Sequence, residues 1–227
     1  MAWLLIIAVV LALVYAPAWW VRRVMRRYSQ PADRYESTGA DLARHLLDEH
    51  GLQSVTVEET DQGDHYDPGE KAVRLAPERY HGKSLTAVTV AAHEVGHALQ
   101  DAGAYPPLAL RTRLVTLLRP LERTGALVLM AAPLIAIALR APSVSLILIL
   151  GGILTLGTST IVHLVTLPTE IDASFSRAMP MLKREGYLIP ADHPHAHKIL
   201  RAAALTYVSV SLMSLLNIAR WWALVRR

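Results

Sequence analysis

Four long apolar blocks and one long polar stretch make up the hydrophobicity pattern of this chain. The apolar blocks cover residues 2–21, 124–139, 141–169 and 202–219. A helix of about 20 apolar residues is long enough to cross the hydrocarbon core of a bilayer, and none of these blocks contains a charged residue. The pattern therefore predicts several membrane-spanning helices. A buried helical hairpin is the alternative for the second and third blocks, but so short a chain offers little polar surface to cover it.

The arginines around the blocks predict how the spans are oriented. Four of them follow the first block, and no basic residue precedes it. Because positive residues tend to stay in the cytoplasm, an uncleaved N-terminal anchor is favoured over a signal peptide, and the polar stretch should face the cytoplasm. The same orientation would place Arg220, Arg226 and Arg227 outside, so full crossing by the fourth block is left open.

The polar stretch, 30–122, has the pattern of a small α+β domain. Leucines at helical spacing after Ser37 and Thr38 predict a helix over 37–50. Alternating residues predict a strand over 53–57 and a returning strand over 72–75, with a turn-rich loop between them. A second helix is expected from Ser84 to about Asp101. This order of helix, small sheet and helix is expected of a minimal zincin-like domain.

Together these elements predict a multi-pass α-helical membrane protein with a small α+β zincin-like catalytic domain. The chain would divide into an N-terminal transmembrane anchor, the zincin-like domain, a two-span transmembrane hairpin, a helical segment that carries a third metal ligand, and a C-terminal transmembrane helix with its tail. The corresponding ranges are 1–21, 22–122, 123–169, 170–201 and 202–227.

Composition narrows the chemistry that the polar stretch can perform. The chain has no cysteine, so a metal must be held by imidazoles and carboxylates. The net charge is +4, but the basic residues flank apolar blocks and are not interleaved with aromatics, which argues against nucleic acid as a partner. The expected partners are a peptide or protein substrate and the lipid bilayer, and the pattern says nothing of the oligomeric state.

The helix predicted from Ser84 carries the sequence HEVGH. His93 and His97 are four residues apart, so both imidazoles lie on one helical face and can reach one metal ion. Glu94 projects beside them and can act as general base on an activated water. Gly96 permits another element to approach the helix closely. The motif therefore predicts a zinc site with a catalytic glutamate, although two histidines on an ordinary helix face remain the alternative.

A catalytic zinc needs a third protein ligand and one open position. Glu170 and Asp172 follow the third apolar block, which two crossings would return to the side that holds His97. A carboxylate at the end of an uncharged span is costly, and a bound dication would offset that cost. Glu170 is the predicted ligand, and Asp172 the predicted acceptor for a histidine N–H or an arginine. The alternative is an acid that only stabilises a helix N-terminus.

Several separate motifs resemble the neutral zinc metallopeptidases of the YugP type, a prokaryotic multi-span family. They are HGKSLTAV, AAHEVGHALQDA, GDHYDP, HLVTLPTEIDAS and AAALTYV. The resemblance implies a gluzincin-like site with zinc on His93, His97 and Glu170, and with Glu94 as base. In the better-known gluzincins an aspartate four residues after the glutamate ligand braces a histidine, and this chain has Ser174 at that offset.

These residues predict peptide hydrolysis by a zinc-activated water with Glu94 as base. His65, Tyr66 and Tyr207 are the candidates for a group that stabilises the oxyanion, and 73–75 is the candidate strand edge for the substrate. An intramembrane protease is disfavoured because the HEVGH helix includes Asp101 and lies outside the apolar blocks. The remaining alternative is a non-catalytic, zinc-stabilised membrane scaffold or quality-control partner, against which an intact Glu94 argues.

Overall fold

The computed structural model describes residues 2–139, 146, 149–151, 162, 165–184 and 186–206. The chain divides into two compact units. One consists of Met1–Ala18, Leu110–Thr166 and Tyr207–Arg227. The other, called the site unit below, consists of Trp19–Ala109 and Leu167–Thr206. The domain boundaries expected from the sequence stay a prediction.

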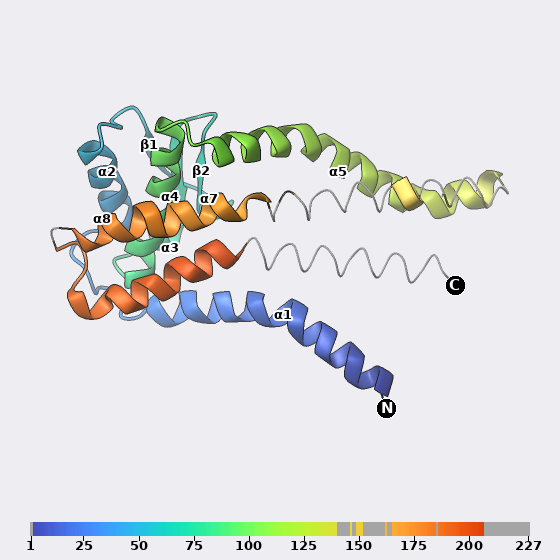
Figure 1. Cartoon of the computed structure of the whole chain (residues 1–227), viewed down its shortest axis with the longest axis horizontal. Coiled ribbons are helices and arrows are strands. Elements are labelled where there is room, and N and C mark those ends of the chain that lie inside the picture. The colour runs from blue at the N-terminus through green and yellow to red at the C-terminus, as the bar shows by residue number, and fades with distance from the viewer. Residues whose placement is uncertain are drawn as a thin grey trace. The chain divides into compact units, whose positions relative to one another are not determined.

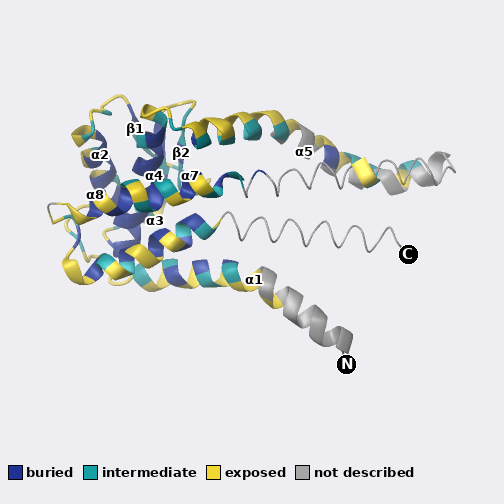
Figure 2. Ribbon diagram, in the orientation of Figure 1, coloured by how far each residue is buried: buried dark blue, intermediate teal, exposed yellow. Residues whose placement is uncertain are grey.

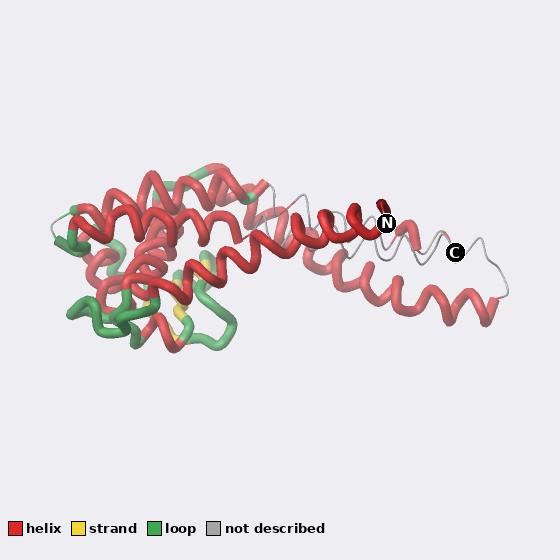
Figure 3. Tube along the Cα trace, turned by 90° about the horizontal axis from the view of Figure 1, so that it is seen from below, coloured by secondary structure: helices red, strands yellow, loops and turns green. Residues whose placement is uncertain are grey.

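Helices make up most of the described chain (Figures 1 and 3), and a small sheet with its loops lies between α2 and α3 in the sequence. The α-helices are α1 (Ala2–Tyr28), α2 (Gly39–Glu49), α3 (Pro77–Tyr80), α4 (Leu85–Ala102), α5 (Pro106–Leu139), α7 (Leu167–Ile171) and α8 (Met179–Lys183). A π-helical stretch, η1 (Asp172–Ala178), joins α7 to α8, and η2 (Pro190–Asp192) is a 3₁₀ turn. Residues 193–206 are also helical.

Both helices predicted in the polar stretch are present, with local sequence reasons for their boundaries. At the start of α2 the Thr38 side chain accepts a hydrogen bond from the Asp41 backbone N–H, and the Asp41 carboxylate accepts one from the Thr38 N–H. Its apolar stripe, which includes Leu46 and Leu47, is fully buried. The Ser84 side chain caps α4 by accepting from the Ala87 N–H.

Helix α4 forms the centre of the site unit. All but one of the residues from Leu85 to Gln100 are buried, as the dark ribbon of α4 in Figure 2 shows. It packs against α2 on one side and against η1 on another. Small residues allow this packing: an added Cβ at Gly96 would lie 2.7 Å from the Ala173 carbonyl oxygen of η1. The polar residues of α4 are therefore held in a close-packed interior.

The sheet has three strands, β1 (Thr56–Glu59), β2 (His65–Asp67) and β3 (Ala72–Leu75). Their order is β1-β3-β2, with β3 parallel to β1 and antiparallel to β2. The sequence pattern missed β2 because its residues lie among turn formers. The strand β3 was expected to offer an open edge, and that expectation is wrong, since β3 is the central strand and pairs on both sides.

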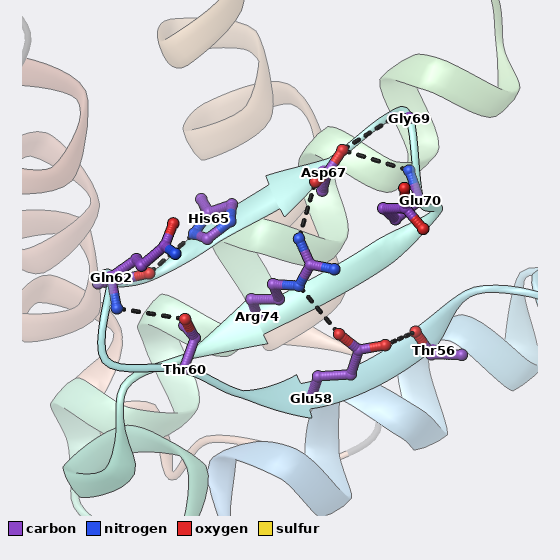
Figure 4. A network of polar contacts seen from close by, with 10 residues as sticks. Thr56, Glu58, Thr60, Gln62, His65, Asp67, Gly69, Glu70 and Arg74 are labelled. Atoms are coloured by element: carbon purple, nitrogen blue, oxygen red, sulfur yellow. Dashed lines mark hydrogen bonds and ion pairs between the residues drawn. The ribbon is translucent and has the colours of Figure 1, made fainter.

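One face of the sheet carries a network of polar side chains (Figure 4). Arg74 on β3 donates to Glu58 on β1 at 2.9 Å and to Asp67 on β2 at 2.7 Å, so one guanidinium links all three strands. The side chains of Val73 and Tyr66 alternate with this set and are buried. The opposite face therefore supplies apolar contacts to the core that contains α4.

The predicted fold class, a multi-pass membrane protein, is corrected by this structure. Within the described ranges, no helix combines the length and the apolar character that a membrane crossing requires. The second block is not a separate helix but the end of α5, whose earlier turns contain Arg111 and Arg113. The first block continues without a break into the arginine-rich end of α1. Most of the third block and most of the fourth lie outside the described residues.

Candidate metal centre

Two histidines of α4 lie side by side in the core of the site unit. His93 and His97 are each 4% exposed, and their ring centroids are 4.8 Å apart. The four-residue spacing places both on one face of the helix. Glu94, the residue after His93, is also buried, at 6% exposure. The local sequence therefore determines how these three side chains are placed relative to one another.

A carboxylate from a distant part of the chain faces both imidazoles. Glu170 on α7 is completely buried, and its Oε2 lies 3.3 Å from Nε2 of His93 and 3.3 Å from Nε2 of His97. It reaches this position because α7 continues into η1, and η1 packs closely on α4 at Gly96. The structure thus brings together the three residues that the sequence suggested as metal ligands.

The chemistry of this donor set fits zinc. Two imidazole nitrogens and one carboxylate oxygen are one of the usual ligand sets of a catalytic zinc that lacks cysteine. Ligand atoms about 2.0–2.1 Å from one ion in tetrahedral arrangement lie about 3.3–3.4 Å apart, which matches the nitrogen–oxygen separations found here. In the described part of the chain, His93, His97 and Glu170 are the one such group that could hold a metal ion.

The electrostatics of the centre favour an ionised carboxylate. Burial alone raises the pKa of Glu170. The facing His97 and His93 outweigh that effect and hold the pKa of Glu170 well below its usual range. A carboxylate that keeps its charge in the core is suited to binding a cation, because desolvation of both is compensated by their attraction.

Each histidine is fixed through its other ring nitrogen. Nδ1 of His97 lies 2.9 Å from Oε1 of Gln100, and Nδ1 of His93 lies 3.1 Å from Oγ of Ser174. The Ser174 hydroxyl donates to the Leu200 carbonyl, so its oxygen accepts from His93. Both Nδ1 atoms therefore carry a hydrogen, and both Nε2 atoms face Glu170.

Asp172 accepts from an arginine, one of the two kinds of partner that the sequence suggested for it. Its Oδ2 accepts from Nε2 of Gln100 at 2.8 Å and from Nε of Arg177 at 2.7 Å. Burial raises the pKa of Asp172, but the hydrogen bonds from Arg177 and Gln100 lower it more, so the net shift is downward. Asp172 thus pairs with an arginine and reaches His97 only through Gln100.

The two described oxyanion candidates, Tyr66 and His65, have polar partners outside the histidine–glutamate group. The Tyr66 hydroxyl donates to the Asp101 carboxylate at 2.6 Å, and burial, then this bond, raises the pKa of the phenol. His65 lies on the sheet face drawn in Figure 4, where its Nδ1 is 2.8 Å from the Gly63 carbonyl oxygen. Tyr207 lies outside the described residues.

Sequence reasoning missed Gln100 and, in part, Ser174. Both are completely buried, and both hold a histidine. Gln100 could have been noticed because it follows His97 by three residues and so lies on the same helical face. Ser174 occupies the offset at which gluzincins carry a bracing aspartate, and a hydroxyl can accept the same N–H.

Comparison with known proteins agrees with this geometry. The family described as "Putative neutral zinc metallopeptidase" matches residues 3–226 of the chain. The protein named "Putative membrane protease YugP" from Bacillus subtilis (strain 168) is 37% identical over 204 residues, which cover 88% of this chain and 86% of that protein. No solved structure matches the chain.

The predicted resemblance to the YugP type is thereby confirmed, and so is the expectation of zinc as the metal. The matched region spans α4, α7 and η1, the elements that carry the buried histidine–glutamate group. The chain therefore belongs to the neutral zinc metallopeptidase family of proteases.

Proposed function

We propose that this chain hydrolyses peptide bonds, with His93, His97 and Glu170 as zinc ligands and Glu94 as general base. The observation that carries the proposal is the pair of 3.3 Å separations between Glu170 and the two imidazoles in a fully buried setting. The family supports a protease, and the HEVGH motif of α4 supports this division of roles.

Zinc held there would supply a Lewis acid and lower the pKa of a water toward about 7. The chain's own residues provide the rest of the chemistry. Glu94 accepts a proton from the attacking water and returns it to the leaving amine. The hydrogen bonds from His93 to Ser174 and from His97 to Gln100 hold a hydrogen on each Nδ1 and fix the ring orientation, so Nε2 is the nitrogen that each ring presents to the metal.

The substrate class is a peptide or an unfolded protein segment. Such segments often bind by adding a strand to a sheet edge, and β1 and β2 are the outer strands of this sheet. The hydroxyl of Tyr66 on β2 also donates a hydrogen bond to Asp101 on α4, which connects that edge to the helix of the metal centre. We therefore assign the peptide to the β2 edge.

The location of the protein at a membrane is proposed from the name of its relative, a membrane protease. The site unit then works beside the bilayer. The expectation that the site faces the cytoplasm of a prokaryotic cell stays a prediction.

Zinc content and cleavage of a casein-like substrate, measured together on the full chain, test the proposal. Wild type is expected to hold one zinc and to cleave. Glu94→Gln keeps the shape of the side chain and should retain zinc while losing about 10²–10⁴-fold in rate. Glu170→Ala should lose both the bound zinc and the cleavage activity.

Three outcomes would contradict the proposal. A wild-type chain that binds no zinc in metal-replete buffer would remove the ligand assignment. A chain that binds zinc but whose Glu94→Gln variant cleaves as fast as wild type would remove the role of the base. A chain that binds zinc and cleaves nothing would favour the non-catalytic, zinc-stabilised scaffold.

A further inference from the structure

A line of polar side chains leads from the metal centre to the outer side of η1. Gln100 accepts from Nδ1 of His97 at 2.9 Å and donates to Asp172 at 2.8 Å. Arg177 donates to the same Asp172 oxygen at 2.7 Å. The guanidinium of Arg177 lies 5.6 Å from the ring centroid of Tyr105, just beyond the end of α4. These contacts form a continuous connection, called the Gln100 relay below, between α4 and η1.

The orientation of the Gln100 amide follows from its neighbours. Its nitrogen donates to two acceptors, the Thr169 carbonyl oxygen at 2.8 Å and Asp172 at 2.8 Å. A flipped amide would set its oxygen against both acceptors and would lose every one of these bonds. Because Gln100 is completely buried, water cannot replace them. Oε1 therefore has one available direction, toward His97.

Along the relay, the neutral group is buried and the two charged groups are partly exposed. The neutral amide lies in the core next to the imidazole, whereas Asp172 and Arg177 are 19% and 25% exposed. A carboxylate placed directly against Nδ1 would add a second buried negative charge beside Glu170. Here the negative charge of Asp172 is matched by Arg177, and the group that contacts Nδ1 of His97 is a neutral amide.

We propose that Gln100 is a positioning residue that transmits the orientation of the Asp172–Arg177 ion pair to His97 and thereby sets the zinc affinity of the site. The inference rests on the proposed zinc ligands and deepens that assignment. It makes Arg177 a determinant of metal affinity although Arg177 does not contact the metal ligands.

The test compares two substitutions of buried polar residues on α4. Gln100→Met preserves most of the volume and removes all three hydrogen bonds of the amide. Thr89→Val is the matched control, because Thr89 is completely buried and its hydroxyl has no hydrogen-bond partner among the described residues. Zinc affinity, measured by competition with a chromophoric chelator, should fall about 10–100-fold in Gln100→Met and change by less than about twofold in Thr89→Val.

A second variant keeps the test decisive if Gln100→Met does not fold. Arg177→Gln alters only the partly exposed end of the relay and should lower zinc affinity in the same direction by a smaller factor. The absorption spectrum of the cobalt-substituted protein should shift in both relay variants and stay unchanged in Thr89→Val, which separates ligand orientation from a general loss of stability.

Nitrogen-15 NMR of His97 in the metal-free protein tests the relay without zinc. Wild type should show the hydrogen on Nδ1, and Gln100→Met should show a mixture of tautomers. Wild-type zinc affinity and an unchanged His97 tautomer in Gln100→Met would overturn the proposal. A protein that binds zinc and shows these shifts but cleaves no peptide would contradict the proposed function and leave the relay intact.

Discussion

The metal centre and the polar face of the sheet use similar side chains in opposite environments. At the centre, Glu170 faces two imidazoles and is completely buried. On the sheet, Arg74 holds Glu58 and Asp67, and these side chains are 25%, 43% and 31% exposed (Figure 4). Both sets join elements that are separate in sequence. Water remains a competing partner on the sheet, whereas the Glu170 side chain at the centre is shielded from bulk water.

This difference decides what each cluster can do. Exposed ion pairs contribute little to stability, because solvent and salt screen them and the side chains lose freedom. A buried carboxylate loses its hydration, so keeping it ionised requires strong compensation from its neighbours or from a cation. The sheet network is therefore interpreted as structural, and the buried cluster as a site retained for metal binding.

The largest contrast is expected when the same amide substitution is made in both clusters. Glu170→Gln should lower zinc affinity by more than about 100-fold, since it removes a charged ligand and not only a supporting contact. Glu58→Gln should leave zinc affinity unchanged. Zinc competition assays on the two variants measure this, and equal affinities would contradict the ligand assignment.

Close packing around the centre predicts the next largest effect. Gly96→Ala would place a Cβ 2.7 Å from the Ala173 carbonyl oxygen, so α4 and η1 must move apart. We expect destabilisation of about 1–3 kcal/mol together with weaker zinc binding. Gly69→Ala is the control beside the sheet network, where the nearest atom belongs to the Asp67 side chain at 3.3 Å. Urea unfolding of both variants measures the difference.

Loss of the hydroxyl that holds His93 should have an intermediate effect on zinc affinity. Ser174→Ala removes the acceptor for His93 Nδ1 in a completely buried position and should lower zinc affinity about 10-fold. Ser29→Ala removes a comparable hydroxyl, which donates to the Met25 carbonyl, away from the metal centre. Its zinc affinity should equal that of wild type, and a similar loss in both variants would argue against a specific role for Ser174.

The smallest effect is expected from a substitution on the sheet, and it is a change in melting temperature that depends on pH. Hydrogen bonds from Arg74 and Thr56 lower the pKa of Glu58. Because the folded pKa lies below the unfolded one, the stabilisation is present above the unfolded value of about 4 and is lost as pH falls through the folded pKa. Arg74→Gln should therefore lower the melting temperature slightly at pH 7, less in high salt, and not at all in strong acid. A difference that persists in acid would contradict this account.

Local patterns predicted a large part of the site unit. The capping residues Thr38 and Ser84 mark the starts of α2 and α4, and helical spacing alone places His93, Glu94 and His97 together. These features depend on residues within one or two helical turns of each other, where backbone geometry leaves few alternatives. The family and the choice of zinc as the metal were predicted from motifs that are equally short in sequence.

Long-range packing determined the rest. The central position of β3, the 3.3 Å approach of Glu170 and the contact of Ser174 with His93 all join segments far apart in sequence. The fold-class error has a related origin, since hydropathy counts apolar residues along the chain but does not show where one helix continues into another. Local propensity does not favour one pairing of distant segments over another. Tertiary packing makes that choice, because burial and close contact stabilise the fold only after distant segments meet.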